Sequence, residues 1–138
     1  MRRRFVVDAS IAVAWVHPTQ ATTETDGLLD EVERGARPVV PTLWFLEVAN
    51  ALLVLERRKK IRSEERATAL RTLHGLDPEV DDAGHRLAFN KVSELATLHD
   101  LSIYDACYVE LALRERLPLA TKDDSLRAVA RRAGVRMR

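Results

Sequence analysis

Residues 5–16 read FVVDASIAVAWV, a β-branched run followed by one carboxylate and an alanine-rich apolar stretch. The first residues predict a short buried strand, and Ala9–Val16 predict a helix that ends near Pro18. Asp8 is the only charged residue in this stretch. A strand that passes directly into a helix is the building unit of a sheet covered by helices, so this segment sets the expectation for the rest of the chain.

The same alternation of strands and helices continues toward the C-terminus. Further strands are expected at residues 37–40, 78–80 and 117–121, with a last edge strand at 135–137. Helices are expected at residues 22–34, 43–58, 63–75, 83–99, 102–116 and 125–133. Thr42 and Ser102 are expected to cap the helices that follow them, and Leu98 to point into the core. The pattern predicts an α/β fold, a single domain over residues 1–138 with a mainly parallel sheet and helices on both faces.

Composition excludes several classes of protein. The chain has 22 Lys and Arg against 21 Asp and Glu, a balance that argues against a polycationic coat protein but not against a nucleic-acid partner. The one cysteine, Cys107, rules out an intrachain disulfide and a cysteine zinc cluster, so a cytoplasmic location is expected. Asp8 and His17-Pro18 interrupt the first apolar run too early for a signal peptide, and no membrane association is expected.

Four carboxylates stand where folds with parallel sheets place their functional sites. Asp8 and Asp123 follow predicted strands, and Glu47 and Asp105 fall near the beginnings of predicted helices. Each has an ordinary alternative: a helix cap for Asp8, a first-turn acid for Asp105, a solvent-facing stripe for Glu47, and a loop or cap for Asp123 or its neighbour Asp124.

Together the four carboxylates predict a site for a hard divalent cation. Like charges at one point cannot all stay ionised without cations, because each raises the pKa of the others. A set of oxygen ligands selects Mg²⁺ or Mn²⁺ over zinc, and Mg²⁺ held by carboxylates usually takes further ligands from substrate phosphates. The pattern is therefore typical of a metal-dependent phosphodiesterase.

Four blocks of the chain resemble one known family, the PIN-domain ribonucleases, and within it the VapC-type toxins of bacterial toxin–antitoxin modules. The blocks are VVDAS at 6–10, PTLWFLEVANAL at 41–52, YDACYVELA at 104–112 and LATKDDSL at 119–126. All four occur in order in a short chain, and the resemblance covers residues 5–137.

This resemblance implies a three-layer α/β/α sandwich and an endoribonuclease that depends on Mg²⁺, with Mn²⁺ as a substitute. It also implies an RNA substrate, a cognate antitoxin protein that blocks the toxin, and a homodimer. The family's acidic quartet is matched by Asp8, Glu47, Asp105 and Asp123, and its neighbouring polar positions by Ser10 and Thr121.

Within the quartet the resemblance suggests separate roles. Asp8 and Asp105 are expected to hold the principal Mg²⁺. Glu47 and Asp123 are expected to complete the shell, hold a second metal or orient the attacking water. Asp124 is an alternative for the fourth ligand, although the spacing after Thr121 favours Asp123.

Three other classes of protein fit the sequence less well. A receiver domain needs an acidic pair after the first strand, whereas Asp8 stands alone and Glu47 falls in a predicted helix. A phosphatase with an aspartate nucleophile requires a second aspartate where this chain has Ser10. A catalytically silent PIN-like module for RNA binding or assembly is the alternative of a different kind, and the intact quartet argues against it.

The residues outside the four proposed metal ligands carry a net positive charge. Without the four proposed ligands, basic residues outnumber acidic ones by five. The excess predicts an acidic pocket within a basic shell, which favours RNA once a cation is bound. One basic run, RRKK at 57–60, ends a predicted helix and suits either the helix dipole and solubility or contact with RNA.

Overall fold

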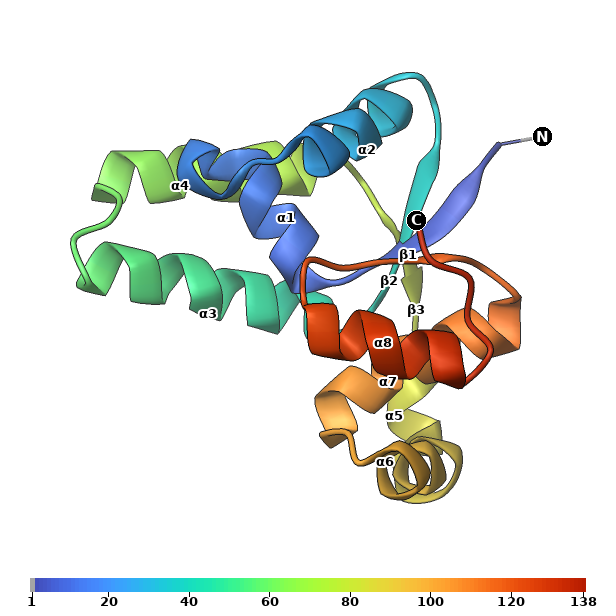
Figure 1. The fold of residues 1–138 in the computed structure, drawn as a ribbon. Helices are drawn as coiled ribbons and strands as arrows, with labels where there is room; N and C mark the ends of the chain where they lie inside the picture. The colour runs from blue at the N-terminus through green and yellow to red at the C-terminus, as the bar shows by residue number, and fades with distance from the viewer. Residues whose placement is uncertain (1) are drawn as a thin grey trace.

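The computed structural model describes residues 2–138 and is built on a four-stranded sheet in the order β3-β2-β1-β4 (Figure 1). The strands are β1 (Arg4–Val7), β2 (Arg37–Pro41), β3 (Glu79–Asp81) and β4 (Leu119–Ala120). All neighbouring strands are parallel. The edge strand expected at 135–137 is present only as a parallel bridge between Met137 and Leu119.

The helices follow the strands in the expected alternation. They are α1 (Ala9–Val16), α2 (Thr23–Glu33), α3 (Leu43–Arg57), α4 (Ser63–Gly75), α5 (Gly84–Leu87), α6 (Ser93–His99), α7 (Ile103–Glu115) and α8 (Asp124–Arg132). A short 3₁₀ turn at Pro18–Gln20 follows α1, and a π turn at Ala88–Val92 joins α5 to α6. The hairpin of α3 and α4 extends away from the sheet, and α1 packs against it (Figure 1).

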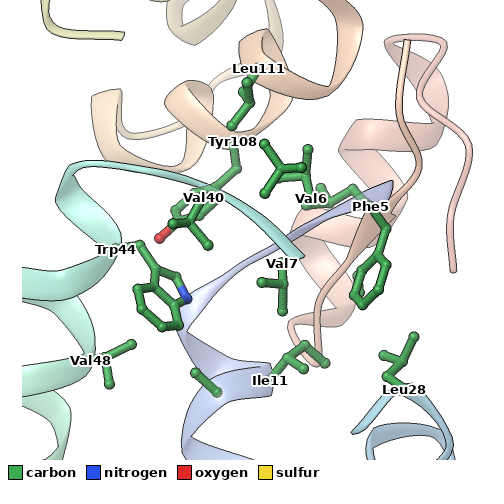
Figure 2. Close-up of a cluster of buried hydrophobic side chains, with 14 of the residues drawn as sticks. Phe5, Val6, Val7, Ile11, Leu28, Val40, Trp44, Val48, Tyr108 and Leu111 are labelled. Atoms are coloured by element: carbon green, nitrogen blue, oxygen red, sulfur yellow. The ribbon is translucent and has the colours of Figure 1, made fainter. Parts of the chain in front are cut away.

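The central strand β1 divides the core into two layers because successive side chains point to opposite faces of a sheet. Figure 2 shows Phe5 and Val7 directed toward Leu28 of α2 and Ile11 of α1. Val6, on the other face, is directed toward α7. Phe5, Val6 and Val7 are each at most 2% exposed. The predicted three-layer α/β/α fold is therefore confirmed, with the sheet between α1 and α2 on one side and α7 on the other.

Three local predictions were wrong. Thr42 does not cap α3, because its backbone is already helical (φ −59°, ψ −32°) and its side chain accepts no capping bond. The helix expected at 83–99 is interrupted by the π turn. Leu98 is 75% exposed, because it lies about a third of a turn around the helix from the fully buried Val92.

The predicted cap of α7 is confirmed. Ser102 caps α7 by accepting the Asp105 N–H at 3.0 Å. Cys107 is a buried core residue, as expected for a small apolar side chain. No helix in residues 2–138 is both long and apolar enough to cross a bilayer.

The pairing of β1 with β4 determines where the site lies. Val7 and Ala120 are partners in the parallel ladder, and the Asp8 N–H donates to the Ala120 carbonyl at 3.2 Å. Asp8 and Thr121 therefore leave the sheet side by side at its carboxyl edge.

Candidate functional site

Asp8 is held at the end of β1 by four hydrogen bonds. Its Oδ1 accepts from the Ser10 N–H at 3.1 Å, the Ser10 hydroxyl at 2.5 Å and the Ile11 N–H at 3.4 Å. Its Oδ2 accepts from the Thr121 hydroxyl at 2.5 Å. The residue is only 7% exposed, and burial raises the pKa of its carboxyl above the ordinary value, although the hydrogen bonds oppose this shift. Asp8 is thus both the cap of α1 and a buried carboxylate with a fixed orientation.

Two hydroxyls tie the β1–α1 turn to the β4–α8 turn. The Ser10 hydroxyl accepts the Lys122 N–H at 2.9 Å while it donates to Asp8. The Thr121 hydroxyl accepts the Asp123 N–H at 3.0 Å while it donates to Asp8. The structure therefore places Ser10 and Thr121 beside Asp8, where their hydroxyls hold the two turns close to the Asp8 carboxylate.

Glu47 lies in the second turn of α3, half-buried, and its carboxylate faces α7. Its Oε1 accepts the hydroxyl of Tyr108 at 2.6 Å. Burial is the main reason why the pKa of Glu47 is raised; the Tyr108 hydrogen bond lowers it, and the charges of Asp105 and Asp8 raise it further. Glu47 is thus near two other acids and is oriented by a buried tyrosine.

Asp105 lies in the first turn of α7. Burial raises its pKa most, and the charges of Asp123 and Asp8 raise it further. These mutual effects require the acids to share one region, since a screened charge acts only over a short distance. Asp8 and Asp123 are joined through the Thr121 hydroxyl at the carboxyl edge of the sheet, and the charges of both act on Asp105, while that of Asp8 acts on Glu47; the four carboxylates predicted from the sequence therefore lie in one region.

Asp123 has a structural role that sequence reasoning left open. Its Oδ1 accepts from the Ser125 N–H at 2.9 Å, the Ser125 hydroxyl at 2.8 Å and the Leu126 N–H at 3.2 Å, so Asp123 caps α8. These bonds, the Ser125 hydroxyl first, lower the pKa of its carboxyl. Asp123 is exposed, and within residues 2–138 its Oδ2 accepts no hydrogen bond, so this oxygen can face a ligand while Oδ1 caps the helix.

Asp124 lines a separate cavity. It lines a cavity of about 330 Å³ together with Lys122, Arg127 and the C-terminal Arg138, on the side of β4 that faces α2. The charge of Asp123, by contrast, acts on Asp105. Asp123 and Asp124 thus have different surroundings, although they are neighbours in the sequence.

Tyr108 is the residue of the site that sequence reasoning missed. It is 1% exposed and belongs to the core, yet its hydroxyl reaches Glu47 across 61 positions of sequence. A signal was present: Tyr108 follows Asp105 by three residues, and this spacing places both on one face of a helix. Nothing in the sequence, however, indicates that α3 and α7 meet there.

The donor chemistry of the group fits a hard divalent cation. None of the four carboxylates forms an ion pair with Lys, Arg or His in residues 2–138. In the same part of the chain, no three Asp, Glu, His or Cys side chains lie close enough to enclose a metal ion. Carboxylate oxygens are the ligands that a hard divalent cation takes, and Mg²⁺ binds through one or two carboxylates and keeps several waters.

Known structures share this architecture. The crystal structure of PAE2754 from Pyrobaculum aerophilum aligns with a TM-score of 0.70 and 21% identity, covering 92% of this chain and 79% of that one. VapBC2 from Rickettsia felis, bound to a DNA fragment from their promoter, aligns with a TM-score of 0.67 and 12% identity over 98% and 97% of the two chains. A toxin–antitoxin complex from Klebsiella pneumoniae aligns with a TM-score of 0.55 and 14% identity over 86% of each chain. Identities this low show a shared fold alone.

Sequence comparison identifies the family. No curated protein is similar enough in sequence to count as a match. The model of the PIN domain, however, matches residues 5–132, which include all four carboxylates and both hydroxyls of the site. The chain therefore belongs to the PIN domain family.

Proposed function

We propose that this protein is a metal-dependent endoribonuclease that acts as the VapC-type toxin of a toxin–antitoxin pair. One observation carries the proposal: burial and the charges of neighbouring acids raise the pKa of Glu47 and Asp105, and within residues 2–138 no basic residue forms an ion pair with either of them, with Asp8 or with Asp123. Such a group is costly to keep ionised on its own, and a divalent cation removes that cost.

Asp8 and Asp105 would hold the principal Mg²⁺, for which Mn²⁺ can substitute, and Glu47 and Asp123 would complete the site. The bound ion would lower the pKa of a coordinated water and offset the charge that develops on the scissile phosphate. The hydroxyls of Ser10 and Thr121 keep the Asp8 carboxylate in one orientation. This fixed arrangement avoids reorganisation during the reaction.

The toxin assignment is supported by the relatives of known structure. One is a VapBC2 assembly and another a toxin–antitoxin complex, and each covers at least 86% of this chain. We infer that this protein likewise has a cognate antitoxin, acts in the cytoplasm and forms a homodimer. Co-expression with the protein of the adjacent gene, followed by light scattering of the free and bound forms, tests these points.

A cleavage experiment tests the proposed activity. The purified protein is incubated with labelled RNA in Mg²⁺, in Mn²⁺ or in EDTA, beside the variants Asp8→Asn and Asp124→Asn. We expect cleavage in either metal and none in EDTA. Asp8→Asn should lose about 100-fold or more of the rate, as is usual when one preorganised electrostatic group is removed. Asp124→Asn serves as the matched control and should retain the rate. Cleavage that survives EDTA and Asp8→Asn would show that another site or a contaminant is responsible.

A further inference from the structure

The turn between α3 and α4 carries four consecutive basic residues, RRKK at 57–60, which we call the basic turn. It lies at the free end of the hairpin that α3 and α4 form, on the far side from the sheet (Figure 1). All four residues are exposed, and none forms an ion pair within residues 2–138. The proposed nuclease site does not use them.

Acidic residues near the basic turn are largely engaged elsewhere. Glu56 accepts from Arg66 at 2.8 Å, and Glu65 pairs with Arg62 at 3.2 Å. Of the acids nearest in sequence, only Glu64 is left to offset the four basic residues. The turn therefore presents a local excess of positive charge to solvent.

The backbone holds the basic turn in a defined shape. The Lys60 N–H donates to the Leu55 carbonyl at 2.8 Å and the Lys59 N–H to the Glu56 carbonyl at 2.9 Å, the pattern of a Schellman motif. Lys59 has a left-handed backbone (φ +59°), a conformation that glycine adopts most easily. The chain thus has a lysine where glycine would be the more stable choice, as it has non-glycine residues at three other left-handed positions.

Arg58 of the basic turn and Glu47 point to the same side of α3. Arg58, the residue that follows the end of α3, comes eleven residues after Glu47, just over three full turns at 3.6 residues per turn. They are separated by about 16 Å along the helix axis at 1.5 Å per residue. Between them in the sequence the one acidic residue is Glu56, which is directed to the opposite side, toward Arg66 of α4.

We propose that the basic turn binds the phosphate backbone of the RNA strand whose scissile bond lies at the carboxylates. The inference rests on the proposed nuclease function and adds a second, non-catalytic contact to it. About 16 Å corresponds to roughly five nucleotides at 3.4 Å per stacked nucleotide, so one strand can reach both places. Guanidinium groups suit phosphates because their planar donors match two oxygens at once.

Binding without cleavage tests the proposal directly. Anisotropy of a labelled single-stranded RNA is measured across a salt series in EDTA, in the Asp8→Asn background, which cannot cut it. One variant replaces three residues of the basic turn with Gln: Arg57, Arg58 and Lys60. A matched control replaces three exposed arginines of the C-terminal segment with Gln: Arg131, Arg132 and Arg136.

We expect the turn variant to bind RNA at least 10-fold more weakly at 0.1 M salt. The slope of log affinity against log salt should fall by about 2, since each lost contact to single-stranded nucleic acid is worth about 0.7. The control should change affinity by less than 3-fold and keep the slope. An unchanged slope in the turn variant, or equal losses in both variants, overturns the proposal and leaves the turn for an acidic protein segment or for solubility.

The variant Lys59→Gly separates binding from stability. Glycine relieves the left-handed strain, so the melting temperature should rise while RNA affinity falls. A rise in both quantities contradicts the inference. Failure of the proposed nuclease function is recognised separately, because in that case the wild-type chain does not cut RNA although the basic turn still governs binding.

Discussion

Replacing Tyr108 with Phe removes one hydroxyl and leaves the buried ring in place. The lost bond is the one that Tyr108 donates to Glu47 at 2.6 Å. Hydrogen bonds to charged groups contribute roughly 1.5–3 kcal/mol when both partners are buried. Glu47 is only half-buried, so water can solvate its freed oxygen, and we expect a loss of about 1–2 kcal/mol in the free energy of unfolding.

The sign of the pH dependence follows from the same bond. The Tyr108 hydroxyl stabilises the ionised form of Glu47 and so opposes the upward pKa shift that burial causes. Without the hydroxyl, the pKa of Glu47 should rise further. The stability lost in the variant should therefore be largest above the pKa of Glu47 and should shrink as pH falls through it.

Urea denaturation at pH 7.5 and pH 4 measures the stability of the metal-free protein, and carboxyl ¹³C NMR follows the titration of Glu47. The matched control is Tyr104→Phe, since Tyr104 is 64% exposed and its hydroxyl has no hydrogen-bond partner within residues 2–138. The control should change neither quantity. If Tyr108→Phe leaves both the stability and the pKa of Glu47 unchanged, the role assigned to this tyrosine is wrong.

Variants at Asp8, Asp123 and Arg114 test other parts of the site and the fold. Asp8→Asn should unfold at a higher temperature than the wild type at pH 7 without metal. The pKa of Asp8 is raised in the folded protein, so the wild type loses stability as pH rises through that pKa, whereas the neutral amide does not. The difference in melting temperature should vanish near pH 3.5, and an equal difference at both pH values would contradict this. Asp123→Ala should lose about 1 kcal/mol of stability in urea denaturation as a lost cap, whereas Asp123→Asn should keep the stability and still cleave RNA more slowly. Arg114→Ala should cost about 2–4 kcal/mol in urea denaturation, because it leaves the buried Glu110 without its partner; partial rescue by adding Glu110→Gln checks the cause.

Features that depend on neighbouring residues were predictable from the sequence. The strand–Asp8–helix unit follows from a β-branched run and one carboxylate, and Ser102 caps α7 as its position suggests. The contact of the turn after β1 with the turn after β4, where Asp8 accepts the Thr121 hydroxyl, was predictable as well, because the carboxyl ends of parallel strands share one edge of a sheet.

Features that depend on contacts between distant elements were not predictable. The bond between Tyr108 and Glu47 requires the relative placement of α3 and α7, which no local pattern encodes. The caps of α3 and α8 depended on backbone angles: Thr42 was already helical and Asp123 extended, although both residues are good caps by type. The π turn at Ala88–Val92 likewise left no mark in the apolar spacing.

The central claim is that the carboxylates form one site for a divalent cation, and titration of Mn²⁺ into the protein tests it most directly. Calorimetry, together with the electron paramagnetic resonance signal of free Mn²⁺, measures binding without requiring any substrate. We predict that the wild type and Asp124→Asn bind Mn²⁺, that Mg²⁺ competes for the same site, and that Asp8→Asn and Asp105→Asn each lose binding. Wild-type protein that binds no Mn²⁺, or Asp8→Asn and Asp105→Asn variants that bind it as well as the wild type, would contradict the account.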